Sequence, residues 1–143
     1  MRTHIGSIFL WILRYWNSKN MDLTITSSVS NDLLEKIQQV LDYITEHFSE
    51  EITASDAAAM CNVSYSYFSR IFKQITKHSF SEYINYVRIT EAEKLLASTD
   101  MNMTEIAMRT GFSTSSYFIQ QFKIYKKMSP KHFKMEFLKG ADK

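Results

Sequence analysis

The residues that could catalyse a reaction or bind a metal ion are few in this chain of 143 residues, and they are scattered along it. The four histidines (His4, His47, His78 and His132) have no metal-ligand spacing with Cys61, the single cysteine, or with carboxylates. The sequence also lacks a glycine-rich phosphate loop and a nucleophile elbow. It therefore predicts no catalytic residue, no metal and no cofactor, and we do not expect an enzyme.

The composition is typical of a folded helical protein. Only three glycines and one proline accompany 45% hydrophobic and 22% charged residues. A single cysteine excludes an internal disulfide and fits a reducing compartment, so we expect a cytoplasmic protein. The uninterrupted apolar run at 8–13 is far shorter than the ~20 residues that span a bilayer, so no contact with a membrane is expected.

The basic residues gather near the end of the chain. From Asn31 onward, 14 Lys and Arg residues balance 14 Asp and Glu residues. The stretch from Met108 to Met135, however, has no acidic residue and contains Arg109, Lys123, Lys126, Lys127, Lys131 and Lys134. A stretch of one sign could follow the phosphates of a nucleic acid, and a solvated helix face would explain it equally well.

A helical period starts after residue 30 and continues almost to the end. It predicts an all-α fold with helices at about 31–48, 54–61, 65–76, 81–98, 102–110 and 115–126, and a last helix from Pro130. Thr53 with Asp56, and Asn102 with Glu105, have the spacing of helix-capping pairs. We expect Phe133 and Phe137 to face inward from the last helix.

The chain contains an internal repeat. Ser-Tyr-Phe at 66–68 recurs at 116–118, and Phe72-Lys73 recurs as Phe122-Lys123, in each case 50 residues later. In each copy a short helix precedes a longer one, which is typical of a helix-turn-helix unit.

Each copy also has the small and turn-forming residues that such a unit needs. Ala58 and Ala107 allow two helices to cross closely, and Asn62 and Gly111 tolerate a positive φ in the turn. The phenylalanines four residues apart should bury one face of the second helix and leave the other face open to a groove. A plain hairpin of helices is the alternative, and the repetition of turn, cap and Phe-x-x-x-Phe-Lys argues against it.

The stretch from Ile37 to Phe133 resembles the DNA-binding domain of the AraC/XylS family of bacterial transcription regulators. The resemblance rests on these motifs: Phe80-x-x-Tyr83, Arg88-Ile89-x-x-Ala92-x-x-Leu95-Leu96, Ile106-Ala107, Gly111-Phe112, Ser116-Tyr117-Phe118, Phe122-Lys123 and Ser129-Pro130. The chain departs from the family at Lys77 and Lys127, where glycine is expected, at Asn62, where glycine is common, and at Gln120, where arginine is frequent.

The resemblance implies two helix-turn-helix subdomains joined by a long linker helix. Their second helices would enter adjacent major-groove segments on one face of double-stranded DNA. We therefore expect a sequence-specific transcription regulator, an activator that contacts RNA polymerase. The alternative is a helical protein-interaction module that has lost DNA binding, which the neutral charge beyond the linker favours.

The resemblance also assigns residues to DNA contacts. The positions that face bases are Ser66, Ser69 and Arg70 on the first recognition helix, and Ser115, Ser116 and Gln120 on the second. As basic residues, Lys73, Lys123 and Lys127 are expected to bind DNA near phosphates. Arg70 can bind both acceptors of a guanine, or it can instead form an ion pair with Glu82 or a neighbour. Gln121, Tyr65 and Tyr67, and the charges of Lys126 and Lys131, are further possible contributors. For Arg88 we expect an ion pair with Glu91 or Glu93.

The resemblance covers only part of the chain. Residues 1–17 form an expected apolar helix, either the remnant of a sensing domain or an element for homodimerisation. Residues 18–30 are an expected linker, 31–138 the double helix-turn-helix domain, and 139–143 a tail.

Overall fold

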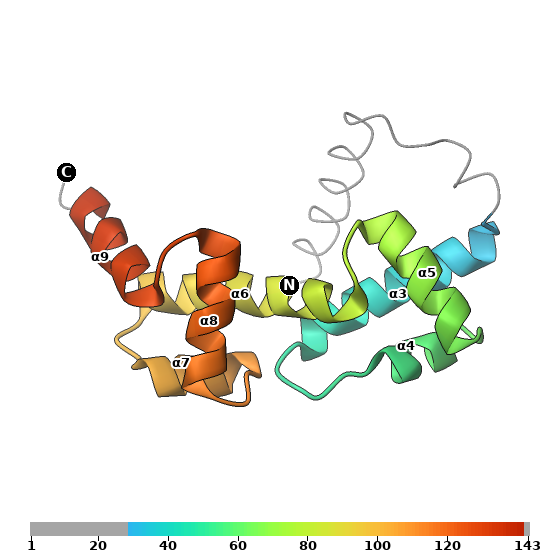
Figure 1. Ribbon diagram of the computed structural model, residues 1–143, viewed down its shortest axis with the longest axis horizontal. Coiled ribbons are helices and arrows are strands. Elements are labelled where there is room, and N and C mark those ends of the chain that lie inside the picture. The colour runs from blue at the N-terminus through green and yellow to red at the C-terminus, as the bar shows by residue number, and fades with distance from the viewer. Residues whose placement is uncertain (1–28, 142–143) are drawn as a thin grey trace.

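The computed structural model describes residues 29–141, which contain seven α-helices and no strand (Figure 1). The helices are α3 (Asn31–His47), α4 (Ala54–Met60), α5 (Tyr65–Thr76), α6 (Phe80–Ser98), α7 (Met103–Thr110), α8 (Ser115–Lys126) and α9 (Pro130–Ala141). They confirm the all-α fold. The predicted helix at 1–17 and most of the predicted linker lie outside the described residues. None of the described helices is long and apolar enough to cross a membrane.

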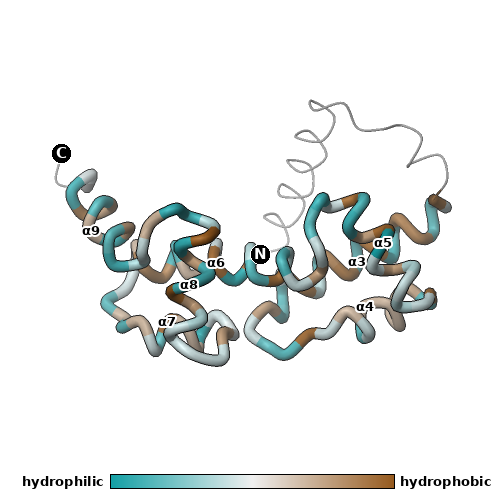
Figure 2. The backbone as a smooth tube through the Cα atoms, viewed as in Figure 1, coloured by the Kyte–Doolittle hydropathy of each residue, from teal (hydrophilic) through white to brown (hydrophobic). Residues whose placement is uncertain are grey.

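Helix α6 runs lengthwise through the middle and connects two units (Figure 1). The first unit contains α3, α4 and α5, whose core includes Phe80 and Ile84 from the start of α6. The second contains α7, α8 and α9, whose core includes Ile89 and Leu96 from the rest of α6. Brown and teal segments alternate along the helices in Figure 2, as expected for amphipathic helices that share a core. The predicted pair of subdomains on one linker helix is therefore confirmed.

Side-chain caps fix where the helices begin. The predicted capping pairs at Thr53 with Asp56 and at Asn102 with Glu105 are both present. A third pair, Ser79 with Glu82, starts α6 at Phe80, one residue earlier than expected. Each cap satisfies backbone N–H groups that the helix leaves without a partner, which stabilises it by about 1 kcal/mol.

The turns inside both units have the predicted geometry. Asn62 has a φ of 56° and Gly111 a φ of 94°, so both adopt the left-handed conformation. The next residue in each turn then donates its N–H back to the small residue of the preceding helix, Val63 to Ala58 at 3.1 Å and Phe112 to Ala107 at 2.8 Å. The two helix-turn-helix units therefore close in the same way.

Aromatic rings fill both cores. Phe68, Phe72, Phe118 and Phe122 are each at most 1% exposed, which confirms the predicted buried faces of α5 and α8. Phe72 meets Phe80 and Tyr83 edge to face at 5.5 and 5.6 Å between ring centroids. Such pairs add attraction beyond the burial of apolar area.

The end of the domain differs from the prediction. Phe133 packs against the second core, with its ring centroid 5.6 Å from that of Phe122, but Phe137 is 47% exposed. Helix α9 continues to Ala141, so residues 139–141 are helical and not a tail. Phe137 lies one turn after Phe133, and α9 extends away from the other helices of its unit toward its C-terminal end (Figure 1). The expectation that Phe137 faces inward is therefore wrong. Helical spacing places Phe133 and Phe137 on one face of α9, but it does not show where the second core ends.

Both long recognition-type helices end at a lysine in a strained conformation. Lys77 has a φ of 65° and Lys127 a φ of 61°. These are the two positions where the resemblance noted above leads us to expect glycine. We expect Lys77→Gly and Lys127→Gly each to raise the free energy of unfolding by about 0.5–1 kcal/mol, because glycine adopts this conformation without steric cost. Urea denaturation measures the change.

The matched control is Lys73→Gly, an exposed position inside α5, which should instead lower stability by about 1 kcal/mol. Lower stability in Lys77→Gly or Lys127→Gly would contradict the assignment of strain to these ends.

Candidate nucleic-acid interface

The predicted polar residues of α5 lie on the side away from its buried phenylalanines. Ser66, Arg70 and Lys73 are exposed and Ser69 is half-buried at the edge of this side. Spacings of three and four residues place such side chains along one stripe of a helix. The structure therefore brings these four predicted residues together on α5.

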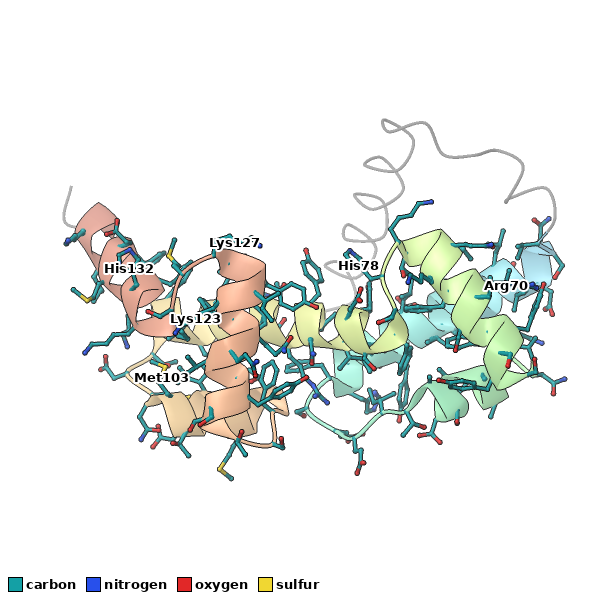
Figure 3. The ribbon with its side chains drawn as sticks, in the orientation of Figure 1. Arg70, His78, Met103, Lys123, Lys127 and His132 are labelled. Carbon is teal, nitrogen blue, oxygen red and sulfur yellow. The ribbon has the colours of Figure 1, made fainter. Side chains whose placement is uncertain are left out.

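Arg70 has no carboxylate partner among the described residues. Its guanidinium lies over the ring of Tyr67, 5.4 Å from the centroid, and Figure 3 shows it on the outer side of α5. The alternative partner, Glu82, instead approaches His78 at 3.5 Å and caps the N-terminus of α6. The intramolecular ion pair with Glu82 is therefore absent, and the charge of Arg70 is available to a partner molecule.

The corresponding face of α8 is also open. Ser116, Gln120, Lys123 and Lys127 are exposed, and Ser115 is half-buried beside them. Lys123 lies in the last turn of α8, and Lys127 is the C-terminal cap of that helix (Figure 3). Both recognition-type helices thus present serine and one longer polar side chain in the first two turns, and lysines in the last turn.

Several other residues of α8 are bound to α6 instead. Asn85 donates a hydrogen bond to the Tyr117 hydroxyl at 3.1 Å and another to Gln121 Oε1 at 3.3 Å. Lys126 forms an ion pair with Glu93 of α6. An acidic residue distant in the sequence therefore already neutralises Lys126, which lowers the contribution to phosphate binding that we expect from this lysine.

The predicted ion pair of Arg88 is also wrong. Glu91 pairs with Lys94 at 3.0 Å, and Glu93 pairs with Lys126. Arg88 instead donates hydrogen bonds from Nε to the Phe48 carbonyl at 2.8 Å and from a terminal nitrogen to the Glu50 carbonyl at 3.0 Å. Burial lowers the pKa of this guanidinium. Sequence spacing along one helix could not reveal partners 38 and 40 residues away.

Other basic residues are likewise either exposed or bound to another part of the chain. Lys131 is exposed at the start of α9, whereas Lys134 donates a hydrogen bond to the Thr99 carbonyl at 2.9 Å. The exposed basic side chains on α5, on α8 and at the start of α9 are suited to binding an anionic surface.

The described residues contain no cluster of three or more His, Cys, Asp and Glu side chains that could hold a metal ion.

A family model described as a helix-turn-helix domain matches residues 57–136, which is more than half of the chain. The chain belongs to the AraC family of transcription regulators. The family and the fold are those of DNA-binding regulators and not of enzymes.

A curated relative resembles a large part of the chain. An uncharacterized HTH-type transcriptional regulator of Staphylococcus aureus is 34% identical over 107 residues, which are 75% of this chain and 14% of that protein. The chain therefore spans only about a seventh of that relative.

Solved structures of similar domains match the fold. The C-terminal domain of AraT, a response regulator of Geobacillus stearothermophilus, is 34% identical with a TM-score of 0.65, over 75% of this chain and 86% of that one. The DNA-binding domain of AdpA, a global transcriptional factor solved in complex with a target DNA, is 24% identical with a TM-score of 0.66, over 76% of this chain and 94% of that one.

Proposed function

We propose that this AraC-family chain regulates transcription by binding double-stranded DNA in a sequence-specific manner, with α5 and α8 in adjacent major-groove segments. The observation that carries the proposal is the pair of exposed polar stripes on α5 and α8, each opposite two fully buried phenylalanines. The major groove of B-DNA is wide enough to admit an α-helix, and residues near the helix N-terminus reach the base edges.

The proposed contacts follow from side-chain chemistry. Arg70 donates two parallel hydrogen bonds to a guanine, and Gln120, in the equivalent place on α8, pairs with an adenine. Lys73, Lys123 and Lys127 neutralise phosphates, while the small hydroxyls of Ser66, Ser69, Ser115 and Ser116 contact bases or phosphates. The structure of AdpA with a target DNA supports the choice of partner, because its domain has the same fold.

The proposal has two further parts. The chain acts as an activator that contacts RNA polymerase, as the family resemblance implies.

Residues 1–17, outside the described range, act in homodimerisation and not in DNA contact. A fragment that starts at Ser28 should therefore bind a single site as tightly as the full chain and lose cooperativity on paired sites, which gel-shift titration measures.

The two half-sites should contribute unequally. A charged donor forms stronger hydrogen bonds than a neutral amide, so the half-site read by Arg70 should dominate affinity. We expect Arg70→Ala to weaken binding by roughly 5- to 150-fold, about 1–3 kcal/mol, and to relax the preference at one base pair. Gln120→Ala should cost less, and Gln120→Arg should shift one preferred base from adenine toward guanine.

Sites selected from a random duplex pool by the wild type and the three variants, at one salt concentration, test these expectations. Unchanged thermal stability of each variant is the control, since both residues are exposed. The proposed orientation of α8 would be refuted by a larger effect of Gln120→Ala than of Arg70→Ala, or by an unchanged preference in Gln120→Arg.

A further inference from the structure

Arg88 lies where the two units meet. The fully buried residues that α6 gives to the first core end at Ile84, and those that it gives to the second core start at Ile89. None of the four residues between them is fully buried, and only Val87 among them packs against the first core. Arg88 is the last of these four. Its side chain is therefore placed to limit bending of α6 between the units.

The contacts of Arg88 extend to both units. Phe48 is the C-terminal cap of α3, so its carbonyl is among those that the helix leaves without a partner. The Arg88 guanidinium donates to this carbonyl and to that of Glu50, and a cation at a helix C-terminus is favourable. The same guanidinium lies 5.8 Å from the centre of the Phe112 ring, in the turn of the second unit. One side chain thus connects the end of α3, the middle of α6 and the turn before α8.

Gly111 allows this close approach. A Cβ atom added to Gly111 would lie 2.8 Å from the Phe48 carbonyl oxygen, 2.9 Å from Ser49 Cα and 3.0 Å from Arg88 Nε. Two of these neighbours are backbone atoms of the first unit, which cannot move aside as the end of a side chain can. The turn of the second unit is therefore packed directly against the loop that follows α3.

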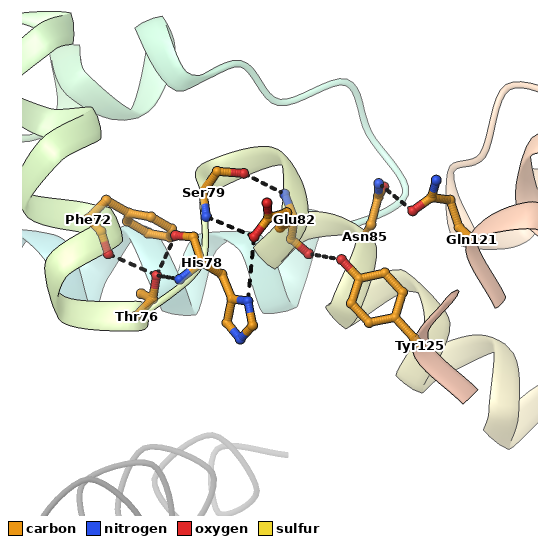
Figure 4. A network of polar contacts seen from close by, with 8 residues as sticks. All are labelled: Phe72, Thr76, His78, Ser79, Glu82, Asn85, Gln121 and Tyr125. Carbon is orange, nitrogen blue, oxygen red and sulfur yellow. Dashed lines mark hydrogen bonds and ion pairs between the residues drawn. The ribbon is translucent and has the colours of Figure 1, made fainter. Parts of the chain in front are cut away.

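Other contacts attach α8 to α6 but do not reach α3. Tyr125 donates a hydrogen bond to the Glu82 carbonyl at 2.8 Å, and Asn85 binds Gln121 (Figure 4). The ion pair of Lys126 with Glu93 is a third such contact. These contacts fix α8 relative to the linker helix, and Arg88 adds a connection from the same helix to the end of α3 in the first unit.

We infer that Arg88 is a positioning residue that fixes α5 relative to α8 and thereby makes the protein select the spacing between its two half-sites. The inference rests on the proposed DNA binding. When two binding modules are joined rigidly, the second binds with a high effective concentration only if the DNA presents its half-site at the matching distance and rotation. Loosening the connection lowers affinity for the matching spacing and raises tolerance of other spacings.

Binding to DNA with altered spacing tests this inference. Duplexes carry the selected site, the same site with one base pair inserted between the half-sites, or the dominant half-site alone. For the wild type we expect the insertion to weaken binding at least about tenfold, a loss comparable with that of a mismatched base pair. Arg88→Ala should reduce this spacing penalty by about threefold or more and leave binding to the single half-site unchanged.

Arg88→Lys and Lys94→Ala are the matched variants. A lysine cannot hold two separate carbonyls and a ring as the planar guanidinium does, so Arg88→Lys should restore only part of the penalty. Lys94 is an exposed cation on the same helix whose ammonium group pairs with Glu91 of that helix, and Lys94→Ala should keep the wild-type penalty. An unchanged penalty in a folded Arg88→Ala variant would overturn the inference.

A measurement without DNA separates this inference from the proposed function. Spin labels at Gln74→Cys on α5 and Ile124→Cys on α8, both exposed positions, report the distance between the helices once the buried Cys61 is replaced by alanine. Arg88→Ala should broaden the distance distribution, and Lys94→Ala should not. Equal widths in the wild type and Arg88→Ala would overturn the positioning role even if DNA binding is confirmed. A broadened distribution in a chain that binds no DNA would support the positioning role and refute the proposed function.

Discussion

Phe122→Ala is expected to lower the free energy of unfolding by about 3–5 kcal/mol, and Phe72→Ala by a similar amount. Both rings are 0% exposed. The Phe122 ring packs against Phe118 at 5.9 Å and Phe133 at 5.6 Å between centroids, from two different helices. Truncation would remove these contacts and leave a cavity that the surrounding helices can only partly fill.

Urea denaturation measures this loss, and Ile124→Ala provides the control on the same helix. Ile124 is 52% exposed, so its truncation should change stability by no more than about 0.5 kcal/mol. DNA binding by the phenylalanine variants should fall only in proportion to the folded fraction. Variants with full stability and no DNA binding would show that the faces of α5 and α8 are reversed.

Binding to DNA is expected to weaken steeply as salt rises. If ~4–6 phosphates are neutralised, the logarithm of the binding constant should fall against the logarithm of salt concentration with a slope of about −4 to −5. Between 50 and 200 mM salt this slope corresponds to a loss of roughly 250- to 1000-fold. The cause is the release of counterions when lysines such as Lys73, Lys123 and Lys127, all exposed, replace them at the phosphates.

Fluorescence anisotropy with a labelled duplex measures the slope. Lys127→Ala should reduce its magnitude by about 1, because one phosphate contact is lost. Lys126→Ala is the informative comparison, since Lys126 is paired with Glu93 and should leave the slope almost unchanged. A binding constant that does not respond to salt would contradict the proposed surface.

Features determined by a few neighbouring residues were predictable from the sequence. The capping pairs at Thr53 and Asn102, and the positive φ at Asn62 and Gly111, depend on contacts within about five residues. The buried faces of α5 and α8 were predictable for the same reason, because spacing alone places side chains on a helix face.

Features that depend on distant partners were not predictable. Arg88 was expected to bind an acidic residue of its own helix, but its partners are carbonyls at the end of α3. Lys126 was expected to be a free charge, but Glu93 lies beside it. The exposure of Phe137 depends on where the second core ends, and no local signal in α9 marks that point. The DNA-contacting roles of the residues on α5 and α8 stay predictions.

Hydroxyl-radical footprinting of the chain on a site selected from random duplex DNA tests whether α5 and α8 bind DNA together. Two recognition helices on one linker helix should protect two patches on the same face of the duplex, about 10 base pairs apart, which is one helical turn. Arg70→Ala should weaken the patch that includes its guanine more than the other patch. Failure to enrich any duplex, or protection of a single patch by the intact chain, would contradict the account.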